Sequence, residues 1–196
     1  MTIEGLDWSP ILAGRIEWLD RPFSEEEIHN VVLHLNNKKA PSPNGFTIAF
    51  SQEGWETIKD DLLRVFLEFH NNGLINQSTN ATFIALVPKN SQISRILDYG
   101  PISLVTSLYK IIAKVLLGRL HKVFQDTIFL TEGVFVEGKQ ILDVVQIANE
   151  LVNEKRRSRE EGVVFKIDFE KAYDHVDWVF LDHVLERKGF SPRWRS

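Results

Sequence analysis

The stretch FKIDFEKAYDHVDW, residues 165–178, is the most informative part of this 196-residue chain. It completes the segment GVVFKIDF (162–169), whose β-branched and aromatic residues predict a buried strand. A helix is expected to follow near 177–188, with Gly189 as the residue that ends it. The pattern therefore predicts a strand that carries Asp168 towards a turn, followed by a helix.

Asp168 is the candidate for metal chemistry. A carboxylate at the end of a strand can point into a cleft and bind a divalent metal, and two-metal phosphoryl transfer needs such oxygen ligands from more than one strand. An isolated aspartate on a strand more often caps a turn or pairs with a lysine, here Lys166 or Lys171. Asp174 and Asp177 fit helix-cap roles. Residue chemistry alone favours the structural role for Asp168.

Outward from this segment the chain is mostly helical by its periodicity. Ser24 and Glu27 form a capping-box pattern at the start of a helix in PFSEEEIHNVVLHL, and NNKKAPSPNG (36–45) is expected to be a loop. Ser191 followed by Pro192 opens another helix, from which we expect the fold to continue past Ser196. The remaining expected elements are a strand in TFIALVP and helices near 53–71, 106–125 and 139–157.

Composition excludes several classes of protein. There is no cysteine, so disulfides, thiolate zinc sites and cysteine nucleophiles are excluded, and the six histidines do not cluster. The start, MTIEGLDWSP, does not resemble a signal peptide, and no apolar run reaches membrane-spanning length. The net charge is −4, but residues 81–125 hold six Lys or Arg against one acid. That basic stretch could meet phosphate, although solvated helix faces explain it more simply.

The segment GVFVEGKQ (133–140) has the glycine and lysine spacing of a phosphate-binding P-loop. Gln140 stands where a hydroxyl would hold magnesium, and the bulky residues 134–136 suit a phosphate cradle poorly. A chance match is the better interpretation.

Six segments in order resemble the reverse transcriptases of LINE-type, non-LTR retrotransposons, of the kind found in plants. The resemblance implies a mainly helical α+β fold, with the fingers and the first part of the palm of a right-hand polymerase. It divides the chain into a lead-in and helix (1–36), a fingers-like region (37–158) and an incomplete palm (159–196). The segments are KAPSPNGF (39–46), TFIALVPK (82–89), DYGPISLVTSLYKIIAKVLLGRL (98–120), FVEGKQILDVVQIANE (135–150), FKIDFEKAYDHV (165–176) and LERKGFSPRW (185–194).

The resemblance also implies roles for single residues. Asp168 matches the metal-binding aspartate for Mg²⁺ or Mn²⁺, with Phe169 supplying the backbone beside it. Tyr173 matches the aromatic gate that excludes a ribose 2′-hydroxyl. Lys89 matches a basic position near the triphosphate, and Lys139 and Gln140 match a segment near the template. The implied partners are an RNA template, a DNA primer and deoxynucleotides, and nuclear action is implied.

The chain departs from the family pattern at several positions. Gly100 replaces an arginine expected to grip the triphosphate, Glu137 reverses a charge, Lys139 replaces an arginine, and Ser42 and Asn44 replace a glycine and an aspartate. The paired aspartates of the later palm motif are not among the 196 residues, so the chain is expected to be a truncated copy that is inactive by itself. Two alternatives are a non-catalytic RNA- or partner-binding module that uses the basic stretch 81–125, and, more distantly, a P-loop nucleotidase.

Overall fold

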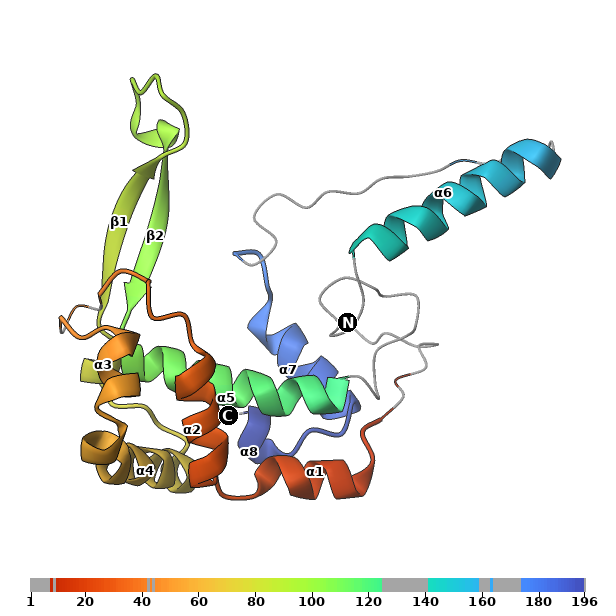
Figure 1. Cartoon of the computed structure of the whole chain (residues 1–196). Helices are drawn as coiled ribbons and strands as arrows, with labels where there is room; N and C mark the ends of the chain where they lie inside the picture. Colours follow the sequence, from red (N-terminus) through yellow and green to blue (C-terminus); the bar gives the residue numbers. More distant parts are fainter. Residues whose placement is uncertain are drawn as a thin grey trace. The chain divides into compact units, whose positions relative to one another are not determined.

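The computed structural model describes residues 8, 10–41, 43, 45–124, 141–158, 163 and 174–195 (Figure 1). The chain divides into two compact units. One unit is Arg21–Gly118, and the other combines Met1–Asp20 with Arg119–Ser196. The two units are described separately below. The expected functional division at residues 36 and 158 remains a prediction.

The unit Arg21–Gly118 has a core built from three helices: α2 (Glu25–His34), α4 (Trp55–Asn72) and most of α5 (Ser107–Phe124). Each helix contributes apolar side chains at helical spacing, which places them on one face. The shorter helix α3 (Ile48–Glu53) adds one residue to this core. The buried members are Ile28, Val32, Ile48, Trp55, Leu62, Phe66, Ile111, Ile112 and Val115.

The ends of these helices follow from local sequence. The Ser24 hydroxyl accepts a hydrogen bond from the amide of Glu27 at 3.2 Å, as the capping pattern predicts. Helix α4 ends at Gly73, whose φ of +68° lies in the left-handed region that favours glycine. The predicted helices in 25–34, 55–72 and 107–124 are thus confirmed, with the second beginning at Trp55 rather than at residue 53.

Helix α3 was not expected, and it serves to close helix α2. The side-chain Nε2 of Gln52 donates to the backbone oxygens of Val32 and Leu35, both at 2.9 Å, and to that of Leu33 at 3.1 Å. The last carbonyls of a helix lack partners within the helix. The Gln52 side chain supplies hydrogen-bond donors to these carbonyls from a separate helix, and it thereby holds the residues at the end of α2 in place.

A β-hairpin connects the helical segments of the same unit. Strand β1 (Thr82–Pro88) pairs antiparallel with β2 (Tyr99–Val105), with Thr82 opposite Val105 and Pro88 opposite Tyr99. The strand in TFIALVP is confirmed, whereas β2 was not predicted. A short 3₁₀ helix precedes each strand: η1 (Gln77–Asn80) lies before β1, and η2 (Ile96–Asp98) lies before β2. At the base of the hairpin, the Thr106 hydroxyl donates to the Thr79 carbonyl.

The second unit contains α1 (Ala13–Asp20), α6 (Ile141–Ser158), α7 (Trp178–Arg187), α8 (Pro192–Arg195) and the last turns of α5. Its core consists of Ile11, Leu19, Val123 and Phe190. Arg119 is 1% exposed, and its guanidinium donates to the Leu19 carbonyl at 2.9 Å. The expectation that the cations of 81–125 line solvated faces is therefore wrong for Arg119, which ties α5 to the end of α1.

The predicted elements near the C-terminus are confirmed where the structure describes them. Asp177 caps α7, with its carboxylate accepting from the amides of Val179 at 2.9 Å and Phe180 at 3.0 Å. Gly189 has a φ of +85° just after α7. Helix α8 begins at Pro192, while the Ser191 hydroxyl donates to the Asp20 carboxylate at 2.7 Å. The strand expected in 162–169 lies outside the described residues apart from Val163.

Candidate nucleotide-binding hairpin

Among the expected site residues, the structure describes Lys89. Asp168, Phe169, Tyr173, Lys139 and Gln140 lie outside the described residues, as does the P-loop-like segment 133–140. The position that the resemblance assigns to the triphosphate is the hairpin of β1 and β2, which the structure describes.

Lys89 is the first residue after β1, and the hairpin holds both its backbone and its side chain. Its amide donates to the Asp98 carbonyl at 2.8 Å, and its ammonium donates to the Leu97 carbonyl at 3.2 Å. The side chain is exposed. An ammonium carries three donors, and the Leu97 carbonyl uses one, so Lys89 can also donate to an anion at this surface.

Gly100 lies beside Lys89 across the hairpin. It pairs with Val87 in the register, and a Cβ built at Gly100 would be 3.8 Å from Cε and 3.9 Å from Cγ of Lys89. These are ordinary van der Waals distances, so a Cβ at position 100 would contact the lysine side chain without a clash. The two positions that the resemblance assigns to the triphosphate thus share one face of the hairpin, although they are far apart in a linear motif.

The tip of the hairpin is ordered by Asp98, a residue that sequence reasoning did not single out. Its carboxylate accepts from the amides of Arg95 at 2.8 Å and Ser94 at 2.9 Å. The hydrogen bond from the Ser94 amide, followed by that from Arg95, holds the pKa of Asp98 below its ordinary value. An aspartate directly before a proline-containing strand was the available signal, since such residues commonly organise turns.

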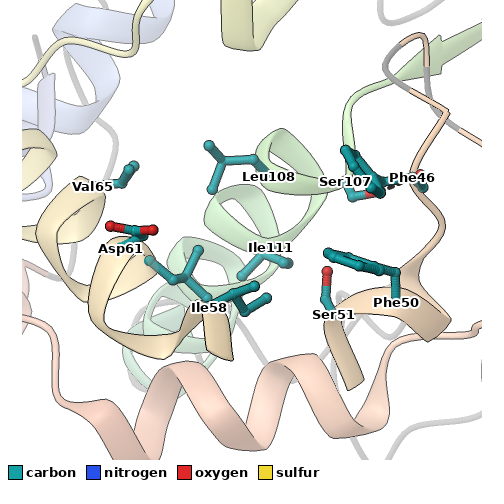
Figure 2. A pocket seen from close by; sticks show the side chains of 10 residues that line it. Phe46, Phe50, Ser51, Ile58, Asp61, Val65, Ser107, Leu108 and Ile111 are labelled. Carbon is teal, nitrogen blue, oxygen red and sulfur yellow. Dashed lines mark hydrogen bonds between the residues drawn. The ribbon is translucent and has the colours of Figure 1, made fainter. Parts of the chain in front are cut away.

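An apolar pocket of about 230 Å³ lies elsewhere in the same unit, between α3, α4 and the start of α5 (Figure 2). Phe46 and Phe50 form one wall, with ring centroids 4.6 Å apart, and Asp61 lies at another side. Asp61 is exposed and pairs with Arg64 at 3.2 Å. The lining includes this single charged residue and no cation, so the pocket does not suit a triphosphate.

The described residues offer no group of three His, Asp or Glu that could hold a metal ion. His29 is half-buried and stacks on Trp55, with ring centroids 4.4 Å apart. The ring of His34 is exposed and lies 2.7 Å from the Asn30 carbonyl. In the same described part of the chain, no helix is long and apolar enough to cross a membrane.

Comparison with known proteins identifies the family. The family model described as reverse transcriptase (RNA-dependent DNA polymerase) matches residues 87–196, more than half of the chain. A protein of Xenopus laevis, the transposon TX1 uncharacterized 149 kDa protein, is 30% identical over 189 residues, which are 96% of this chain and 14% of that protein. The chain therefore belongs to the reverse transcriptase family and is similar to a transposon protein. It spans a small part of that relative's length.

Proposed function

We propose that this chain contributes the fingers and the first metal-binding carboxylate of an RNA-directed DNA polymerase from a LINE-type, non-LTR retrotransposon. The observation that supports the proposal is the register of the hairpin, because a Cβ at position 100 would lie 3.8 Å from the Lys89 side chain and both residues fall within the family-matched residues 87–196. The reaction is transfer of a deoxynucleotide to a primer end, directed by an RNA template. The plant-type subgroup stays a prediction from the sequence segments alone.

The metal-binding role falls to Asp168. A carboxylate is the donor that Mg²⁺ and Mn²⁺ prefer, so the residue type fits one ligand of such an ion, with the backbone of Phe169 beside it. The bound metals would activate the primer hydroxyl and stabilise charge on the phosphates. Tyr173 would pack beneath the sugar of the incoming nucleotide and reject a 2′-hydroxyl by steric clash. Asp168 alone is too small a donor set for two ions.

The hairpin would hold the triphosphate end of the nucleotide. The Lys89 ammonium is anchored through the Leu97 carbonyl and can still donate to a phosphate oxygen. Glycine at position 100 has no side chain with which to form the charge-assisted fork that an arginine would make with the same phosphates. Lys139 and Gln140 would contact the template strand. We infer that this chain binds nucleotide more weakly than a relative with arginine at position 100.

The test is a chimera in which residues 1–196 are joined to the segment that follows the matched region in the Xenopus transposon protein. We expect template-directed incorporation of deoxynucleotides on primed RNA with Mg²⁺, and its loss in Asp168→Asn. The polypeptide of 196 residues by itself should incorporate none, because two-metal transfer requires more carboxylates than Asp168. Incorporation by the chimera that Asp168→Asn does not reduce would contradict the assignment of Asp168.

The two alternatives make different predictions. A binding module would show salt-dependent RNA binding while the chimera remained inactive. Because Arg119 is buried, a binding module would have one cation fewer on the surface formed by residues 81–125. A P-loop nucleotidase would bind ATP with magnesium and lose that binding in Lys139→Ala.

A further inference from the structure

The C-terminal end of α6 carries a group of cations followed by a serine. Lys155, Arg156 and Arg157 lie in the last turn of the helix, and Ser158 is its final residue. All four side chains are exposed. A hydroxyl that directly follows a run of cations has the charge pattern that basophilic kinases recognise in their protein substrates. This end of α6 is therefore a candidate modification site, to which the proposed polymerase chemistry assigns no role.

Ser158 is accessible to an enzyme because residues 145–158 of α6 lie outside both hydrophobic clusters. Every side chain in that range is exposed except that of Val152, which is half-buried. The last carbonyls of a helix have no partner within the helix, so the final turn unwinds at small cost. Kinases bind their substrates as extended segments, and an unwound final turn of α6 provides one.

The other serines whose side chains the structure describes differ from Ser158. Each of them has at most one Lys or Arg among the three residues before it. Ser191 is the most similar, because Arg187 and Lys188 lie shortly before it. However, Ser191 is half-buried, and its hydroxyl donates to the Asp20 carboxylate at 2.7 Å. Among these described serines, a cluster of cations and an exposed hydroxyl coincide at Ser158.

We propose that Ser158 is a phosphorylation site for a basophilic serine/threonine kinase, with ATP as the phosphate donor. Transfer forms a bond between Oγ of Ser158 and the γ-phosphorus of ATP, and it breaks the bond from that phosphorus to the bridging oxygen, which leaves with ADP. The hydroxyl proton passes to the catalytic carboxylate of the kinase. Arg156 and Arg157 serve recognition, because guanidinium groups pair with carboxylates of the kinase. This modification neither requires nor excludes polymerase activity.

The phosphate loosens the last turn of α6. In the unmodified chain the Ser158 hydroxyl donates to the Lys155 carbonyl at 3.1 Å. The ester oxygen carries no hydrogen, so this bond is lost, and a charge of about −1.5 to −2 is added at the negative end of the helix dipole. Glu154, one turn earlier, adds repulsion between like charges. Exposed ion pairs with the cations of the same turn contribute little, so the loosening prevails.

The test treats the full chain with ATP and the catalytic subunit of cyclic-AMP-dependent protein kinase, a basophilic enzyme. We expect about one phosphate per chain, located at Ser158 by tandem mass spectrometry, and loss of nearly all labelling in Ser158→Ala. Ser191→Ala is the matched control and should be labelled like the parent chain. Hydrogen exchange in the peptide that ends at residue 158 should become about twofold faster or more after phosphorylation.

Charge variants test how the site is recognised. Arg156→Ala/Arg157→Ala should lower the kcat/KM of the kinase for the chain by about 10-fold or more, because two charge-assisted contacts are removed. Lys38→Ala/Lys39→Ala removes two exposed lysines from another part of the chain. This control should change kcat/KM by about twofold or less, because those lysines are distant from Ser158 in the sequence.

Each contrary result is distinct. Undiminished labelling of Ser158→Ala, or equal effects of the two charge variants, overturns the assignment of the site. Glu160 and Glu161 follow in the sequence and suit an acid-directed kinase. Labelling of Ser158 by casein kinase 2 but not by the basophilic enzyme therefore overturns recognition through the cations. Unchanged or slower hydrogen exchange after phosphorylation overturns the loosening of α6.

Discussion

The hairpin and the three-helix core of the unit Arg21–Gly118 use apolar residues in opposite ways. In the core, Ile28, Phe66 and Val115 are at most 1% exposed. In the hairpin, Phe83, Ile84 and Leu86 are more than half exposed, and the described sheet consists of just two strands. A two-stranded sheet without a packed face is marginally stable by itself. The contrast indicates that the helices supply the core of this unit, and the proposed function gives the hairpin a role in nucleotide binding.

Removal of an aromatic ring should lower stability much more in the core than in the hairpin, and this is the largest difference expected between the two regions. Phe66→Ala removes a side chain that is 1% exposed in α4, so it should lower the free energy of unfolding by about 3–5 kcal/mol. Phe83→Ala, in β1, removes a ring that is 59% exposed and should cost about 1 kcal/mol or less. Urea denaturation followed by far-UV circular dichroism compares the two, and equal losses would mean that the hairpin packs against a core after all.

The next effect concerns nucleotide affinity. In the chimera, Gly100→Arg should lower the KM for deoxynucleotide by roughly 10- to 150-fold, which corresponds to about 1.5–3 kcal/mol for a charge-assisted contact. A Cβ at position 100 would be at ordinary van der Waals distance from the Lys89 side chain, so the urea midpoint should stay unchanged. Steady-state incorporation against nucleotide concentration measures the effect. An unchanged KM would show that DYGPISL does not face the triphosphate.

The smallest effect is confined to the tip. The hydrogen bonds from the amides of Ser94 and then Arg95 lower the pKa of Asp98 in the folded chain. The carboxylate therefore contributes to the order of the tip above its ordinary pKa of 3.8, and this contribution is lost as the pH falls through the lowered value. The amide resonances of Ser94 and Arg95 should shift in that acidic range. The same shift in Asp98→Asn would contradict this origin.

Local signals predicted the helices and their ends well. Ser24, Gly73, Asp177 and Gly189 each act within one turn of their own helix, so their roles can be read from a few neighbouring residues. Helix α3 has six residues, too few for a periodic pattern, and its Gln52 works through carbonyls of another helix. Strand β2 contains Gly100 and Pro101, which argue against a strand until pairing with β1 is known.

The features that could not be predicted from the sequence depend on residues that are far apart in the chain. Arg119 is buried because the Leu19 carbonyl, 100 positions away, meets its guanidinium. The adjacency of Lys89 and position 100 follows from the hairpin register, which a linear motif does not state. The family segments assign Lys89 and position 100 to the triphosphate, and that assignment stays a prediction. The structure adds which face of the hairpin they share.

The central claim is that the hairpin serves nucleotide binding rather than stability, and Lys89→Ala in the chimera tests it most directly. The account predicts a KM for deoxynucleotide raised by about 10-fold or more, from loss of a charge-assisted contact, with an unchanged urea midpoint. Lys114→Ala, an exposed lysine of α5 in the same basic stretch, is the control and should leave KM unchanged. An unchanged KM in Lys89→Ala, or a fall in stability that accounts for the lost activity, would contradict the claim.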